Sequence, residues 1–257
     1  MTTAQSWSIV VFCYNEVGTV AQVVARAQRL LVAMEVPRYE LIVVDDGSTD
    51  GSSEVIRRMA DSSTEVRAIF HKQNLGIGHA LRAGYAAARY ENLCAVPADG
   101  QFDLDELLPF GNLEPDCFVS FYRRENTTYT PARNALSYAN RLLNRWLIGL
   151  NLRDVNWVKI YKTAQVQSLP LALESSLVES ELCAKLQRSG YRALEVESKY
   201  LPRTSGQSKG ASWPVVRQAL RDTVHLSRVL RQFKNRKTLD TRPWLLDPNP
   251  SVSKSSV

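Results

Sequence analysis

The sequence predicts an α/β fold: a doubly wound, mainly parallel sheet with flanking helices, followed by a basic amphipathic helix near the C-terminus. Short apolar runs alternate with helical patterns four times in the first hundred residues, which is typical of βαβ units. The composition of the 257 residues, 44% hydrophobic and 23% charged, is that of a globular protein. The longest apolar runs fall far short of the roughly 20 residues that span a bilayer. Disordered, disulfide-scaffold and transmembrane classes are therefore excluded.

Each expected element has a local signal. Buried strands are predicted where β-branched and apolar residues run together, at 8–12, 40–44, 66–70 and 93–96. Helical spacing of apolar residues predicts helices at 17–34, 51–60 and 79–90, the first ended by Pro37. Later elements are a helix from Thr130-Pro131 with Leu136, Leu143, Leu147 and Leu150 on its apolar face, a strand at 155–161, a helix at 177–187 ended by Gly190, and a strand at 193–200. The expected organisation is a globular domain over 1–212, a basic helix over 213–237 and a disordered tail over 238–257.

The cysteines and the N-terminus indicate a cytoplasmic protein. Four cysteines, Cys13, Cys94, Cys117 and Cys183, form no CxxC pair, which favours buried thiols over a zinc site or disulfides. The first ten residues carry no basic segment and lead directly into a strand, so a secretory signal is not expected.

The net charge of +6 lies in one segment. Between Trp213 and Lys237, seven basic residues stand against the single acid Asp222, and leucines alternate with the arginines. Such a helix suits an anionic membrane surface, which would place the protein peripherally on the inner face of the membrane. A helix packed on the body with a solvated cationic face fits equally well. Nucleic acid is disfavoured, because the rest of the chain is neutral and carries no nucleic-acid motif.

Polar residues follow three of the predicted strands, where an open α/β sheet binds its ligands. These are Tyr14 to Glu16, Asp45 with Asp46, and Asp99 with Gln101. Carboxylates at such positions can accept hydrogen bonds from a nucleoside, and Asp99 with Gln101 could ligate Mg²⁺ or Mn²⁺. Ordinary turns and helix caps use the same residue types, so both interpretations stay open. The Gly76-x-Gly78 pair favours helix entry over a phosphate loop, and the histidines show no metal-ligand spacing.

Four motifs taken together carry more information than any one of them. FCYNE, LIVVDDGSTDGS, NLGIGHALRAGY and PADGQFD occur in this order within the first hundred residues. The pattern resembles the family 2 glycosyltransferases with the GT-A fold. SFYRR, ELCAKLQRSGY and YLPRTSGQSK extend the resemblance, over about residues 7–210, to the polyprenyl- and dolichyl-phosphate sugar transferase branch. The resemblance implies an inverting transfer of a sugar from a nucleotide-diphosphate donor to an acceptor, with polyprenyl phosphate as one candidate.

The resemblance also implies roles for individual residues. Nucleoside contacts fall to Tyr14, Glu16, Asp45 and Asp46, metal and diphosphate contacts to Asp99 and Gln101, and phosphate contacts to Arg123, Arg133, Arg203 and Lys209. Guanidinium groups bind phosphate oxygens bidentately, which suits such a reaction. The catalytic set is thus Asp99, Glu181 and Arg203. Glu181 matches a position that is acidic in the family, and Glu179 is the alternative residue for that role. The alternative without a catalytic role is that Glu181 is an ordinary solvent-exposed glutamate on a helix surface.

One residue departs from the family pattern. The fourth strand commonly ends in Asp-x-Asp, whereas here Pro97 takes the first position. One carboxylate ligand is therefore missing, which weakens the expectation of a metal site without removing it. The alternative to an enzyme is a non-catalytic nucleotide-sugar-binding protein with a degenerate site.

Overall fold

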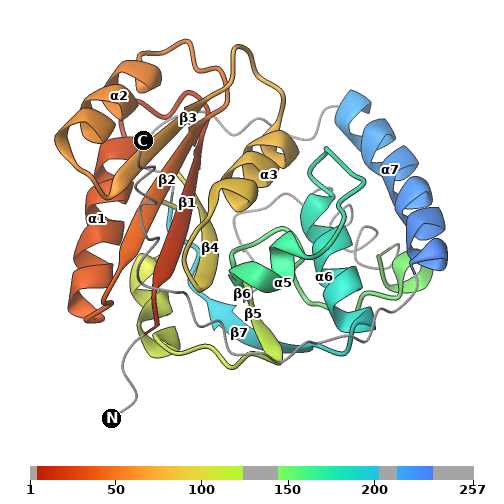
Figure 1. The fold of residues 1–257 in the computed structure, drawn as a ribbon. Coiled ribbons are helices and arrows are strands. Elements are labelled where there is room, and N and C mark those ends of the chain that lie inside the picture. The colour runs from red at the N-terminus through yellow and green to blue at the C-terminus, as the bar shows by residue number, and fades with distance from the viewer. Residues whose placement is uncertain (1–4, 124–143, 203–212, 234–257) are drawn as a thin grey trace, which may run out of the picture.

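The computed structural model of the chain describes residues 5–123, 144–202 and 213–233. Within these ranges one sheet has the strand order β3-β2-β1-β4-β6-β5-β7 (Figure 1). The strands are β1 (Trp7–Cys13), β2 (Tyr39–Asp45), β3 (Val66–Phe70), β4 (Asn92–Pro97), β5 (Cys117–Arg123), β6 (Lys159–Lys162) and β7 (Arg192–Ser198). The helices are α1 (Val20–Ala33), α2 (Ser52–Ser62), α3 (Ile77–Ala87), the 3₁₀ helix η1 (Leu104–Phe110), the π-helix η2 (Asn144–Ile148), α5 (Thr163–Gln167), α6 (Val178–Arg188) and α7 (Trp213–Gln232).

The sheet is doubly wound and mainly parallel, as the sequence predicts. β1 pairs in parallel with β2 on one side and β4 on the other, and β2 pairs in parallel with β3. β6 is antiparallel to both β4 and β5, and β5 is parallel to β7. The strand order therefore reverses between β1 and β4, and an open α/β sheet forms its ligand crevice at such a point.

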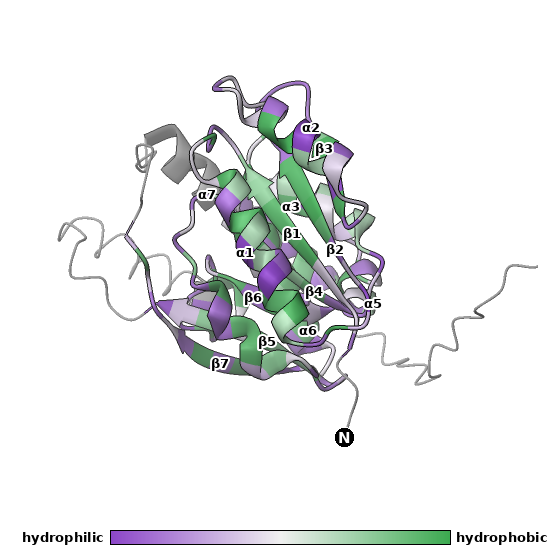
Figure 2. Ribbon diagram, turned by 90° about the vertical axis from the view of Figure 1, so that its left-hand side faces the viewer, coloured by the Kyte–Doolittle hydropathy of each residue, from purple (hydrophilic) through white to green (hydrophobic). Residues whose placement is uncertain are grey.

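Two hydrophobic layers cover the sheet. The side chains of Ile9 and Val11 pack with α1 on one face, whereas Val10 and Ile42 pack with α3, α6 and α7 on the other. β1 and β2 are thus buried on both faces, and Figure 2 shows them as largely hydrophobic ribbons between amphipathic helices. Because neither face needs polar residues, these strands read as continuous apolar runs in the sequence.

Gly84 allows α3 to pack closely on β1. A methyl group at this position would overlap both γ-methyl groups of Val10. The close approach brings the start of α3 to the carboxyl end of the neighbouring strands, where the ligand crevice is expected.

Several boundaries differ from the sequence predictions. β6 begins at Lys159 rather than at 155, because Asp154 accepts a hydrogen bond from the Asn156 backbone N–H and closes a turn there. β5, η1 and α5 were not predicted as elements. The predicted 130–150 helix lies mostly outside the described residues; its described end is η2, and Leu147, expected on the apolar face, is exposed whereas Leu150 is buried.

The remaining predictions fare differently. All four cysteines are buried free thiols, as expected. The basic helix forms as α7 and buries Leu226 and Leu230, and the predicted tail lies outside the described residues. Among the described residues, none of the helices is both long and apolar enough to span a bilayer.

Candidate functional site

A pocket of about 220 Å³ opens at the carboxyl ends of β1 and β4. Its wall comes from the ends of these two strands, the β2–α2 junction and the start of α3. The lining residues are Phe12, Cys13, Tyr14, Glu16, Asp46, Asn74, Gly76, Ile77, Ala80, Pro97, Ala98 and Asp99. Four of the residues predicted for a nucleotide-sugar site, Tyr14, Glu16, Asp46 and Asp99, therefore lie around the same hollow.

The loop that carries Tyr14 and Glu16 is fastened to the β2–α2 loop. Asn15 adopts φ of 56°, a left-handed conformation that asparagine tolerates better than most residues. Its backbone N–H donates to Ser48 Oγ at 2.9 Å, and its side-chain Oδ1 accepts from the Thr49 backbone N–H at 2.8 Å. The Glu16 N–H donates to Ser52 Oγ at 3.0 Å. These bonds fix the direction in which the loop enters the pocket.

Asp50 completes the same contact between loops. Its carboxylate accepts from the Val17 backbone N–H and from both the hydroxyl and the backbone N–H of Ser52. Burial raises the pKa of Asp50, but these hydrogen bonds outweigh that effect and hold the pKa below its ordinary value. The ionised carboxylate is therefore the form that holds the two loops together.

The two adjacent aspartates have different surroundings. Asp45 does not line the pocket: its Oδ1 accepts from the Ser48 backbone N–H at 3.1 Å and its Oδ2 accepts from the Ser53 hydroxyl. Asp45 thus shapes the turn after β2, which matches the turn interpretation of this motif.

Asp46 lies at the pocket wall and supports the loop that leads to α3. It is 4% exposed. Its Oδ1 lies 2.7 Å from His71 Nδ1 and accepts from the Leu75 N–H at 3.0 Å, and its Oδ2 accepts from the Gly76 N–H at 2.8 Å. With three bonds made inside the protein, most of the acceptor capacity of this carboxylate is used in holding residues 71–76 against the pocket.

Asp99 and Gln101 stand on a turn at the end of β4. The Gln101 backbone N–H donates to Asp99 Oδ1 at 3.0 Å, and Gly100 between them has φ of 72°. The Gln101 Nε2 donates to Tyr200 Oη at 2.5 Å, which leaves the amide oxygen as its acceptor atom. A carboxylate and an amide oxygen are hard ligands of the kind that Mg²⁺ and Mn²⁺ accept, with water and substrate oxygens completing the shell. Pro97 also lines the pocket, so an apolar ring stands where a further carboxylate would be expected.

Arg123 lies outside the pocket lining, in a half-buried cluster next to this turn. Its Nε and Nη2 pair with the Asp154 carboxylate at 2.7 and 3.2 Å. The guanidinium carbon lies 4.7 Å from the ring centre of Trp157 and 5.8 Å from that of Tyr200. The guanidinium group is therefore held by a carboxylate and two rings, and Tyr200 connects the cluster to Gln101.

Glu181 and Glu179 lie inside the protein rather than on a helix surface, and neither lines the pocket. Glu181 is fully buried, pairs with the Lys185 ammonium and accepts from the backbone N–H groups of Ala172 and Leu173. The interpretation of a solvent-exposed glutamate is therefore wrong for Glu181. In the described contacts, this side chain holds the segment before α6.

Glu179 belongs to a second buried network. It accepts from the hydroxyls of Tyr85 and Tyr161, and Lys159 Nζ lies 3.4 Å away. Burial, reinforced by the Glu179 charge, raises the pKa of the Tyr85 hydroxyl well above its ordinary value, so it stays protonated as a donor. The network joins α3, β6 and α6.

Three predicted phosphate contacts, Arg133, Arg203 and Lys209, lie outside the described residues. The glycines of the third motif serve helix entry, as expected: Gly76 precedes α3, and a methyl group at Gly78 would overlap the backbone at Glu174 and Ser175. Residues that the sequence reasoning did not single out include His71, Trp157 and Tyr200. His71 follows a predicted strand, Trp157 lies inside one, and Tyr200 opens the YLPRTSGQSK motif, but none of these signals indicates a contact with the site.

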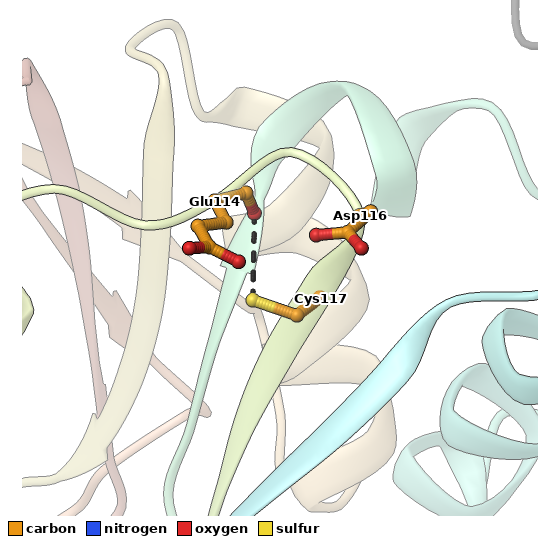
Figure 3. A group of neighbouring side chains, drawn as sticks. All are labelled: Glu114, Asp116 and Cys117. Carbon is orange, nitrogen blue, oxygen red and sulfur yellow. Dashed lines mark hydrogen bonds between the residues drawn. The ribbon is translucent and has the colours of Figure 1, made fainter.

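An acidic group at the other edge of the sheet has a different character. Glu114, Asp116 and Cys117 lie close together at the start of β5, where the Cys117 Sγ donates to the Glu114 backbone oxygen (Figure 3). Arg192 pairs with both carboxylates at 3.1 and 3.0 Å. Because β5 runs parallel to β4, its start lies at the sheet edge opposite the pocket. This group is a surface ion-pair cluster, separate from the candidate site.

A mainly parallel α/β sheet with a carboxylate-lined pocket at its point of reversal defines an α/β domain of the GT-A class. Residues 8–113 match the family model described as glycosyl transferase family 2. The matched segment contains every residue that lines the pocket.

Curated relatives extend the similarity beyond that segment. The chain is 25% identical over 211 residues to an undecaprenyl-phosphate 4-deoxy-4-formamido-L-arabinose transferase of Edwardsiella ictaluri, covering 80% of this chain and 63% of the relative. It is 26% identical over 208 residues to an undecaprenyl-phosphate mannosyltransferase of Micrococcus luteus, covering 76% and 84%. The chain thus spans somewhat less than two thirds of the first relative's length.

A solved structure shares the fold. Glucosyl-3-phosphoglycerate synthase of Mycobacterium tuberculosis, crystallised with Mn²⁺, UDP-glucose and phosphoglyceric acid, superimposes with a TM-score of 0.61. The identity is 23%, and the match covers 87% of this chain and 80% of the other. At this identity the likeness supports the GT-A architecture.

Proposed function

We propose that this chain transfers a sugar, with inversion, from a nucleoside-diphosphate sugar to polyprenyl phosphate, assisted by Mg²⁺ or Mn²⁺. The observation that carries the proposal is the pocket at the carboxyl ends of β1 and β4, where Tyr14, Glu16, Asp46 and Asp99 lie around one hollow. The relatives named as undecaprenyl-phosphate transferases support the choice of acceptor.

Within this proposal the pocket takes the nucleoside, and the end of β4 takes the diphosphate. Tyr14 and Glu16 would bound the nucleoside on the β1 side, with residues 74–77 opposite, held in place by Asp46. A divalent ion would be held by Asp99 and the Gln101 amide oxygen, and when bound it would neutralise charge on the diphosphate leaving group. The mycobacterial synthase, which shares the fold, was crystallised with Mn²⁺ and UDP-glucose, and this supports the choice of a metal and a nucleotide-sugar donor.

A phosphate acceptor does not require a general base, so neither Glu179 nor Glu181 has to supply one. A phosphate is already ionised near neutral pH and can act as the nucleophile without losing a proton, whereas a hydroxyl needs a general base within hydrogen-bond reach. Glu179 and Glu181 are both engaged in buried networks. The proposed roles of Arg133, Arg203 and Lys209 in binding phosphate stay with this proposal. An acceptor of this kind lies in a membrane, so the protein would work as a peripheral protein on its cytoplasmic face.

The first experiment measures thermal unfolding of the purified protein with UDP, GDP, CDP, dTDP and their common sugars, each with and without Mn²⁺ or Mg²⁺. A ligand that binds the native state alone raises the melting temperature by mass action, so a selective rise identifies the nucleotide and its metal dependence. The Asp99→Asn variant should lose the metal-dependent part of that rise. Asp61→Asn, an exposed aspartate on α2, serves as the matched control.

The second experiment uses the selected donor and a short-chain polyprenyl phosphate dispersed in detergent. Release of nucleoside diphosphate together with a glycosylated lipid phosphate is expected. If the folded protein binds nucleotide but no nucleoside diphosphate is released with any donor and acceptor tested, the result would favour the alternative that Pro97 suggests, a non-catalytic binding protein.

A further inference from the structure

A surface of mixed apolar and basic character lies where η2 meets α7, on the side of the molecule away from α1 and α2 (Figure 1). Its base is firmly packed. Ile148, Leu226 and Leu230 are buried in one cluster with α6. The Arg188 guanidinium on α6 donates to the backbone oxygens of both Leu230 and Ile148, which joins η2 and α7 to the body.

The outer side of this surface exposes large apolar groups. Trp146 is 81% exposed, the highest value for a large hydrophobic side chain in the part of the chain that the structure describes. Leu147 beside it is 42% exposed, and Val224 on α7 is 44% exposed. Exposing a tryptophan next to a leucine gives up the burial energy that such side chains usually contribute, which marks an interaction site when polar residues surround them.

Exposed cations lie on the same two elements as these apolar groups. Arg145, Arg221, Arg228 and Arg231 are all exposed, and Asp222 is the one acid in η2 and in residues 221–233. We name the η2–α7 surface as Arg145, Trp146, Leu147, Arg221, Val224, Arg228 and Arg231.

The combination of positive charge and exposed apolar side chains on the η2–α7 surface indicates what kind of partner binds there. A second copy of this chain would bring like charges together across a symmetric contact, which is unfavourable. A duplex nucleic-acid backbone would engage the arginines but would leave the aliphatic side chains of Leu147 and Val224 without an apolar contact. An anionic bilayer satisfies both, because tryptophan rings enter the headgroup region while arginines contact lipid phosphates.

We propose that the η2–α7 surface docks on an anionic phospholipid membrane, with Trp146 and Leu147 entering the interface. The inference deepens the proposed function and rests on it, since a polyprenyl phosphate acceptor is found in the bilayer. Docking is a property of this surface alone, and it is measured without donor or acceptor.

The test is flotation of the full chain with vesicles of phosphatidylcholine alone or mixed with phosphatidylglycerol. The wild type should float with the anionic vesicles, and less so as salt increases. Trp146→Ala should weaken binding by at least about tenfold, because an aromatic side chain of this size carries a large apolar area. The double variant Arg228→Glu/Arg231→Glu should weaken it by about 25-fold or more, since each cation near such a surface contributes roughly fivefold.

Matched controls come from the opposite side of the molecule. Val32→Ala on α1, where Val32 is 64% exposed, and Arg58→Glu at an exposed position of α2 should float like the wild type. Circular dichroism and the nucleotide-induced melting shift should stay unchanged in every variant, which shows that a loss of flotation is not a loss of folding.

Three results would overturn the inference: no flotation of the wild type, flotation insensitive to both η2–α7 variants, or equal losses in the controls. Dimerisation abolished by Trp146→Ala, or tighter binding of a duplex oligonucleotide than of anionic vesicles, would also overturn it. Turnover of donor with detergent-dispersed acceptor separates the two proposals. If the protein turns over donor but does not bind vesicles, the docking proposal is wrong and the proposed reaction stands. If it binds vesicles but does not turn over donor, the proposed reaction is wrong and the docking proposal stands.

Discussion

Replacing Asp46 with asparagine tests whether this carboxylate chiefly supports the pocket wall or chiefly contacts the nucleoside. Its two oxygens serve three donors, His71 Nδ1 and the backbone N–H groups of Leu75 and Gly76, and the side chain is almost fully buried. An amide has one acceptor oxygen. If that oxygen keeps the first two donors, the Gly76 N–H faces an NH₂ group instead of an acceptor.

The expected cost follows from this count. Losing one charge-assisted bond, with its buried donor left unpaired, and weakening the two others costs about 2–4 kcal/mol. For a protein of this size, each kcal/mol shifts the melting temperature by roughly 2–4 °C, so a fall of about 4–16 °C is expected.

Urea titration measures the change in free energy of unfolding, and an unchanged m-value shows that the unfolding transition is otherwise the same. The exposed Asp61→Asn substitution should cost within about 0.5 kcal/mol. An Asp46→Asn protein as stable as the wild type, but unable to bind nucleotide, would refute the supporting role and return Asp46 to a direct contact.

Gly84→Ala should destabilise the protein by about 1–3 kcal/mol, because the new methyl group overlaps Val10, and the double variant Gly84→Ala/Val10→Ala should lose less than the sum of the single losses in urea titrations. Glu181→Gln leaves the Lys185 ammonium buried without its carboxylate and should cost about 3–5 kcal/mol, while turnover per folded molecule stays near that of the wild type; a stable variant with abolished turnover would instead assign Glu181 to catalysis. Burial raises the pKa of the Cys183 thiol to about 12, so the folded state keeps a proton that the unfolded state loses above about pH 8.5. The contribution of Cys183 to the free energy of unfolding should therefore be fully present below that pH and should fall as the pH rises toward 12. Cys183 should react with a thiol reagent only after unfolding, and rapid labelling of the native protein would contradict this expectation.

The first half of the fold was predictable because each element carries its own signal. β1 and β2 are buried on both faces, so they appear in the sequence as unbroken apolar runs, and the polar residues after them fall at the pocket. The second half is less regular. β6 has four residues, and the aromatic-rich β5 was interpreted as part of a motif rather than as a strand.

The site was predictable in its location but less so in its internal contacts. Motif order indicates that Asp46 and Asp99 approach each other, because strands of a parallel sheet end at one edge. It does not indicate that the carboxylate oxygens of Asp46 accept hydrogen bonds from residues 71–76, or that Glu181 is buried with Lys185. These contacts depend on how separate segments of the chain pack together. Tyr200 meets Gln101 across 99 residues for the same reason.

The strand order has a consequence for how the chain reaches its native state. β1 pairs with β2 across 32 residues and with β4 across 85, and β2 pairs with β3 across 25, so all three pairs lie within residues 7–97. β5 pairs with β7 across 75 residues and must wait for α6. Because the N-terminal part of a chain is synthesised first, strands β1 to β4 are expected to pair before β5 and β7 can do so. Every residue that lines the pocket lies between positions 12 and 99. The pocket can therefore take shape while the remainder of the sheet is still being made.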